Sequence, residues 1–161
     1  MRHDASDIVR AQASCSERFR VNGSTIRKSL EKDRSYPWAK LAELRPSKFY
    51  SDIIESTMGA IFVDSGGCID SCERFLKRIK LIAYLERFMR ERVLLDHPKE
   101  VFDRIFGTQK RDFQVEKTAD GLYNVSVWVE GEEITTIDNC STKNEAVVRG
   151  ANAAIALLFR G

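Results

Sequence analysis

The feature that most constrains the fold of this chain is a change in hydrophobic period at His97-Pro98. Before it, apolar residues recur with the spacing of amphipathic helices. After it, residues 113–116 and 123–129 alternate apolar and polar side chains, as half-buried strands do. Asp120-Gly121 lies between them and is a strong hairpin signal. The pattern therefore predicts an α+β chain, with a helical domain over 1–93 and an α-β-β-β-α domain over 97–161.

Hydrophobic spacing and helix-terminating residues predict the individual elements. In the first part we expect helices over 5–33, 38–45, 47–64 and 69–93, with a break or kink at Asn22-Gly23 and a bend near Leu81-Ile82. In the second part we expect a helix over 98–106, strands over 113–116, 123–129 and 134–137, and a final helix capped by Ser141 or Thr142.

Composition and charge narrow the class of protein. Apolar residues make up 43% of the 161 residues and charged residues 31%, as in an ordinary globular chain. Residues 1–93 carry 18 Lys and Arg against 13 Asp and Glu, whereas residues 94–161 carry 8 against 11. Contacts with a polyanion are therefore expected in the first part. The sequence has no long apolar run and no signal peptide, so we expect no membrane contact. Its four scattered cysteines without a secretory signal predict an intracellular location, cytoplasmic or nuclear.

Two carboxylates stand three residues apart in the apolar helical segment 48–66. Asp52 and Glu55 therefore share one helix face. Such a pair is commonly a solvated surface, and that alternative stays open. Beside a packed face, however, two anionic groups are costly unless a cation neutralises them. Paired carboxylate oxygens suit Mg²⁺ or Mn²⁺, so the pair predicts a divalent metal site.

The complete segment is more specific than the carboxylate pair. Lys48 precedes Asp52 by one turn, Gly59-Ala60 follow Glu55, and the segment ends in Ile-Phe-Val-Asp-Ser-Gly. It resembles the second signature of the ribonuclease III family, K-x-x-x-D-x-x-E-x-x-x-G-A-I-(Y/F)-x-D-S-G, and its ending resembles the last ribonuclease III domain of Dicer enzymes. The resemblance implies hydrolysis of double-stranded RNA by metal-activated water. Asp52 and Glu55 would be catalytic metal ligands, and Lys48 would contact the scissile phosphate or orient a carboxylate, unless it is only an exposed lysine.

The order of elements after residue 97 resembles a double-stranded-RNA-binding domain. The resemblance implies that the start of the last helix grips phosphates, which assigns RNA binding to Lys143 and Arg149. Glu145 opposes them, and the loop 117–121 lacks the histidine expected for minor-groove contact. Weak RNA binding and packing against another protein therefore both remain open for this part.

One half of the family's acidic site has no counterpart in this sequence. The family supplies two further acidic residues from a helix with the pattern N-E-x-L-E-x-L-G-D, which does not occur here. We therefore expect the C-terminal part of a fungal Dicer-like protein, inactive by itself, whose partners are double-stranded RNA and a second ribonuclease III domain. The alternative is a non-catalytic RNA- or protein-binding module.

Cys68 and Cys72 stand four apart as metal ligands sometimes do, but we expect free thiols.

Overall fold

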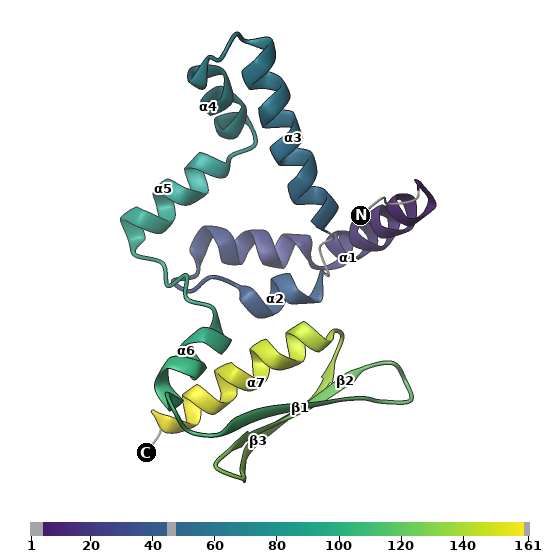
Figure 1. The fold of residues 1–161 in the computed structure, drawn as a ribbon, viewed down its shortest axis with the longest axis vertical. Helices are drawn as coiled ribbons and strands as arrows, with labels where there is room; N and C mark the ends of the chain where they lie inside the picture. Colours follow the sequence, from purple (N-terminus) through teal and green to yellow (C-terminus); the bar gives the residue numbers. More distant parts are fainter. Residues whose placement is uncertain (1–4, 45–47, 160–161) are drawn as a thin grey trace. The chain divides into compact units, whose positions relative to one another are not determined.

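The structure is a computed structural model that describes residues 5–44 and 48–159, without the side chains of residues 5–8, 11, 48 and 49. The chain divides into two compact units. The first contains residues 1–36 and 46–94, and the second contains residues 37–45 and 95–161. Helices precede a three-stranded antiparallel sheet, and a last helix follows it (Figure 1). This arrangement confirms the predicted α+β class.

The described residues of the first unit form four named helices. These are α1 (Ala5–Lys32), α3 (Lys48–Asp64), α4 (Ile69–Arg78) and α5 (Leu81–Glu91). Of the two alternatives expected at Asn22-Gly23, a break or a kink, the break does not occur, because α1 is helical throughout. Gly23 is buried, and the Phe19 ring lies 3.0 Å from the position that a Cβ on Gly23 would occupy. The missing side chain therefore makes room for an aromatic ring of the preceding turn.

The expected single helix over 69–93 is also wrong, because it is two helices. α4 ends at Arg78, and Lys80 takes a left-handed conformation with φ of 63° before α5 begins. A left-handed residue ends a helix because it turns the backbone away from the helical path. Hydrophobic spacing continues across this joint, so periodicity alone predicted a bend and missed the interruption.

The buried part of the first unit lies where α5 meets the end of α1. Ile26 of α1 and Phe88 of α5 are buried. Arg87 of α5 is only 7% exposed and donates hydrogen bonds to the backbone oxygens of Leu30 and Asp33. The last carbonyls of a helix have no intrahelical partner. Arg87 supplies those partners, so its burial follows from its role as a cap for α1.

The second unit places two helices on one face of its sheet. α6 spans Pro98–Phe106 and α7 spans Lys143–Leu158, while β1 (Arg111–Lys117), β2 (Tyr123–Val129) and β3 (Glu132–Cys140) pair in the order β1-β2-β3. The third strand is longer than predicted at both ends. A short helix, α2 (Trp38–Glu43), also belongs to this unit and packs against α7 (Figure 1).

The core of the second unit forms between the sheet and α7. Val125 and Val127 point inward from β2 and are fully buried, and Phe102 joins them from α6. The facing side of α7 is built from small residues. A Cβ on Gly150 would stand 2.9 Å from Val127, so only glycine allows this close approach of helix and strand.

Thr142 provides the N-cap of α7, as one of the two predicted candidates. Its hydroxyl oxygen accepts a hydrogen bond from Glu145 N (2.8 Å) and donates one to the backbone oxygen of Ala42 in α2 (3.2 Å). The Glu145 carboxylate also accepts a hydrogen bond from the backbone N of Ser141, the residue before the cap (2.7 Å). One side chain therefore caps α7 and attaches α2 to it.

Among the described helices, none combines the length and apolar character that a bilayer crossing needs.

Candidate metal and RNA sites

Helix α3 carries the predicted acidic pair. Asp52 and Glu55 lie three residues apart within α3, so they share one face of the helix. The Asp52 residue is half-buried and Glu55 is exposed. Gly59 follows one turn after Glu55, and a Cβ added there would meet no atom within 4 Å. The described chain therefore leaves open space at Gly59, one turn after Glu55.

The apolar residues around this pair are poorly covered. Ile53, Ile54 and Phe62 of α3 are 44%, 38% and 41% exposed, and Val63 is 77% exposed. Helix α4 packs on α3, and the Cys72 thiol of α4 lies 3.8 Å from the backbone oxygen of Met58. A cavity of about 510 Å³ opens between these two helices and is lined almost wholly by apolar side chains.

The acidic pair offers part of a magnesium site. Within the described residues, no group of three or more His, Cys, Asp or Glu side chains is placed to hold a metal ion. Two carboxylates can supply two oxygen ligands, and Mg²⁺ keeps several waters and binds weakly when protein ligands are few. The donors present thus fit the chemistry of Mg²⁺ or Mn²⁺ but leave its coordination incomplete.

Lys48 and Asp64 mark the two ends of α3. The side chain of Lys48 lies outside the described part of the structure, so its predicted contact with phosphate stays a prediction. Asp64 is the last helical residue and is exposed. Ser65 follows it and donates from its hydroxyl to the backbone oxygen of Phe62 (3.1 Å), which helps to close the helix end.

None of the four cysteines, all of which lie in the described residues, forms a disulfide. Cys72 is buried and Cys68 is half-buried at the N-cap of α4. Hydrogen bonds from Ser71, through its side chain and its backbone, lower the pKa of the Cys68 thiol. In the second unit, Cys140 is buried, and burial raises the pKa of its thiol. His97 uses Nδ1 to accept from Lys99 N at the start of α6, so its role there is that of a helix cap.

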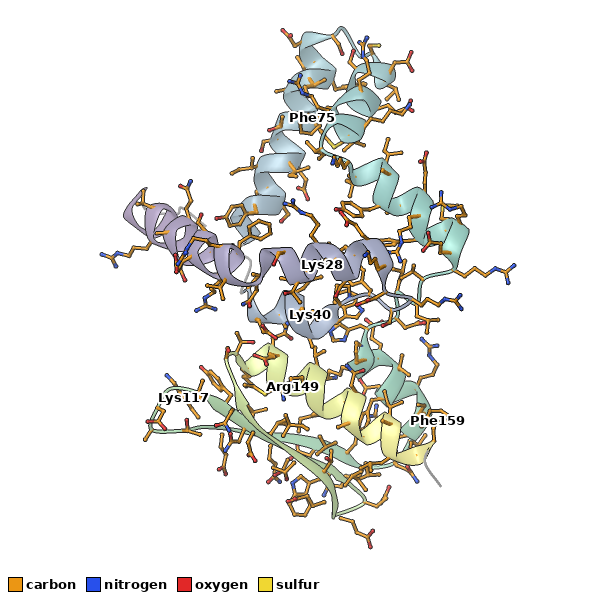
Figure 2. All side chains as sticks on the ribbon, turned by 180° about the vertical axis from the view of Figure 1, so that it is seen from behind. Lys28, Lys40, Phe75, Lys117, Arg149 and Phe159 are labelled. Atoms are coloured by element: carbon orange, nitrogen blue, oxygen red, sulfur yellow. The ribbon has the colours of Figure 1, made fainter. Side chains whose placement is uncertain are left out.

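The two cations assigned to RNA binding have different surroundings. Lys143 is the first residue of α7 and is exposed. Arg149 projects from α7 two turns later (Figure 2), and its Nη1 lies 3.1 Å from Glu145 Oε1 and 3.5 Å from Cys140 Sγ. Glu145 is only 4% exposed. Arg149 is therefore engaged by a buried carboxylate, and this ion pair competes with any phosphate.

The loop between β1 and β2 offers one cation near the end of the hairpin. Lys117 ends β1 (Figure 2), with its Nζ 6.0 Å from the centre of the Tyr123 ring. The turn itself is closed by Thr118, which bonds Leu122 through its backbone and its hydroxyl.

Sequence reasoning had not identified the Arg149–Glu145 pair, although their spacing of four residues on a helix is the signal for it.

Comparison with known proteins gives a consistent result along the sequence. No protein-family model matches the chain. It is similar to part of Dicer-like protein 2. The chain is 35% identical to that protein of Aspergillus oryzae over 166 residues, which cover 99% of this chain and 12% of the relative. It is 37% identical to Dicer-like protein 2 of Aspergillus terreus, over 98% of this chain and 12% of the relative. It is 33% identical to that of Cryphonectria parasitica, over 99% of this chain and 11% of the relative. The chain thus spans about an eighth of the length of these relatives.

Proposed function

We propose that this chain is the C-terminal catalytic segment of a Dicer-like endoribonuclease that cleaves double-stranded RNA. The observation that carries the proposal is the pair Asp52 and Glu55 on one face of α3, beside open space at Gly59, within a chain similar to Dicer-like protein 2 along its length. A divalent ion held there would activate water and stabilise the leaving oxygen of a phosphodiester. The role of Asp52 and Glu55 is to bind and orient that ion.

The site needs residues from another polypeptide segment. Within the described residues no third acidic ligand joins Asp52 and Glu55, and the apolar face of α3 around Ile53 and Phe62 is only partly covered. We assign the missing ligands and the covering surface to a ribonuclease III partner, either elsewhere in a longer chain or in a second molecule. The chain by itself is then expected to bind the ion weakly and to leave RNA uncut.

The metal assignment can be tested on this chain with Mn²⁺ as a paramagnetic probe. We expect Mn²⁺ to broaden the amide NMR signals of α3 around Asp52 and Glu55 at millimolar concentration, and Asp52→Asn to abolish the effect. Asp64→Asn is the matched control, because it removes one exposed carboxylate from the same helix. Equal broadening in the wild type and Asp52→Asn, or broadening centred on Asp64, would contradict the assignment.

Cleavage provides the second test. A labelled double-stranded RNA incubated with this chain and Mg²⁺ should remain intact, because the coordination of the ion is incomplete. Discrete short products would show that the chain is active alone and would overturn that part of the proposal.

The non-catalytic alternative is favoured by one observation in the second unit. The ion pair of Arg149 with the buried Glu145 reduces the cationic surface of α7 to Lys143 at its start. Phosphate neutralisation dominates affinity for nucleic acid. A unit with so few available cations suits weak RNA contact or binding to a protein. Filter binding of a double-stranded RNA at increasing salt distinguishes the two, since tight and salt-sensitive binding requires several phosphate contacts.

A further inference from the structure

The outward face of the sheet in the second unit carries carboxylates on both edge strands. Asp112 and Glu116 of β1 point away from the core, because the alternate residues Phe113 and Val115 pack against it. Glu133 of β3 joins them, since it pairs with an outward-facing residue of β2. All three carboxylate residues are exposed.

Cations do not balance this face within the three described strands. Their sequences contain only two basic residues, Arg111 and Lys117, both at inward positions of β1. Arg111 Nε lies 2.6 Å from Asp103 Oδ1 of α6, and Lys117 lies against the Tyr123 ring. The outward face therefore has an uncompensated negative charge.

An aromatic ring lies in the centre of the acidic face. Trp128 of β2 pairs directly with Asp112 on one side and with Glu133 on the other. Adjacent strands are about 4.8 Å apart, so the two carboxylate-bearing strands flank the indole at a separation of about 10 Å. The indole Nε1 is buried and has no hydrogen-bond partner, and it is the one such side-chain atom identified in residues 5–44 and 48–159.

Neutral donors hold the carboxylates in place. Thr136 Oγ1 donates to Glu133 Oε1 (2.7 Å) and lies 3.1 Å from Ser126 Oγ, while Asp112 Oδ1 accepts from Phe113 N (2.8 Å). These bonds orient the two carboxylates without cancelling their charge. The row across the sheet is thus a fixed arrangement of acid, aromatic ring and acid.

We propose that this sheet face docks a lysine- and arginine-rich polypeptide segment, with one cationic side chain over the Trp128 ring between Asp112 and Glu133. A cation there gains attraction from the face of the indole and from both carboxylates. The unit has 12 acidic and 10 basic residues, which adds long-range attraction for a basic partner and repulsion of phosphates. The surface is therefore a protein-binding face, separate from RNA contact, and it does not depend on the cleavage activity.

The test measures binding of a ten-residue peptide of alternating lysine and threonine to the full chain at about 50 mM salt, where surface charges are weakly screened. We expect saturable one-to-one binding, and none of a peptide with glutamate in place of lysine. The double variant Asp112→Asn/Glu133→Gln should weaken binding about threefold to tenfold. Trp128→Leu, which keeps both carboxylates, should weaken it about twofold to fivefold.

The matched control is Glu100→Gln/Asp120→Asn, which removes the same charge from exposed positions on α6 and in the β1–β2 turn. It should leave the affinity unchanged. Equal weakening by the control pair would reduce the effect to general charge attraction and overturn the proposal. Failure of the lysine peptide to bind, or its displacement by double-stranded RNA, would overturn it as well. If Trp128→Leu does not fold, the proposal is tested by comparing the affinity of Asp112→Asn/Glu133→Gln with that of Glu100→Gln/Asp120→Asn.

Discussion

Helices α3 and α7 have nearly the same length, but the described chain buries them very differently. α3 has 17 residues, and from residue 50 onward none of its side chains is fully buried. α7 has 16 residues, and six of them are buried, including Ala146, Ala151 and Ala154. The second unit thus completes its own core, whereas α3 leaves apolar and acidic side chains exposed. Four substitution experiments sharpen this comparison, from the largest expected effect to the smallest.

Loss of an aromatic side chain should affect the two units unequally. Phe102 is fully buried in the second unit, so Phe102→Ala should lower the free energy of unfolding by about 3–5 kcal/mol. Phe62 in α3 is 41% exposed, and Phe62→Ala should cost less than about 1 kcal/mol. Denaturant unfolding followed by circular dichroism reports on the helices of both units. Both tryptophans, Trp38 and Trp128, belong to the second unit, so their fluorescence isolates the effect of Phe102→Ala. Equal costs for the two variants would contradict the contrast in burial.

The glycines of the same two helices give a comparison of opposite signs. Gly150→Ala places a methyl group 2.9 Å from Val127 and should destabilise the second unit by about 1–3 kcal/mol. Gly59→Ala enters open space in α3 and should stabilise that helix by about 0.5–1 kcal/mol, because alanine restricts the unfolded chain. Thermal unfolding followed by circular dichroism measures both. A destabilising Gly59→Ala would mean that another group already occupies the space at Gly59.

Removal of the Thr142 hydroxyl should have a smaller effect. Thr142→Ala loses the cap of α7 and the bond to Ala42, and should cost about 0.5–2 kcal/mol. Thr142→Ser keeps a hydroxyl and serves as the control. If both variants unfold at the same denaturant concentration, then the hydroxyl does not hold the two helices.

The smallest effect concerns Glu43 at the end of α2. Burial, and then the carboxylate of Glu145, raise the pKa of Glu43 above its ordinary value of 4.5, against the opposing influence of Arg149 and Lys40. A raised pKa means that the folded state binds the proton more tightly, so this contribution to stability is present below pH 4.5 and is lost as the pH rises through the folded pKa. Glu43→Gln should flatten the pH dependence of the melting temperature between pH 4.5 and 7. An unchanged pH profile would contradict this environment for Glu43.

Local sequence pattern predicted most of the second unit because the residues that begin, cap and connect its helices and strands lie within or next to those elements. Pro98 at the start of α6, the turn at Asp120-Gly121 and the cap at Thr142 each encode an element within a few residues. In the first unit, local pattern suggested a break at Gly23 that does not occur and missed the interruption at Lys80. Gly23 stays helical because the Phe19 ring packs on it, and α4 separates from α5 at Lys80 although hydrophobic spacing continues.

The acidic pair was predictable because three residues on a helix suffice to align Asp52 with Glu55. The environment of Arg149 was not recognised in advance, since it depends on the burial of Glu145, which is 4% exposed and pairs with Arg149. Lys143 and Arg149 are equally cationic in sequence, but one is exposed and the other is paired. Charge counting alone therefore overstates the phosphate-binding capacity of this unit.

The sequence by itself determined the helical and strand periods, the caps and the placement of two carboxylates on one helix face, because these depend on neighbours a few residues apart. The tertiary structure decided which groups are covered, which cations are already paired, and that an acidic row with Trp128 at its centre faces away from the core. Those properties depend on residues distant in sequence, whose proximity arises only when strands and helices pack.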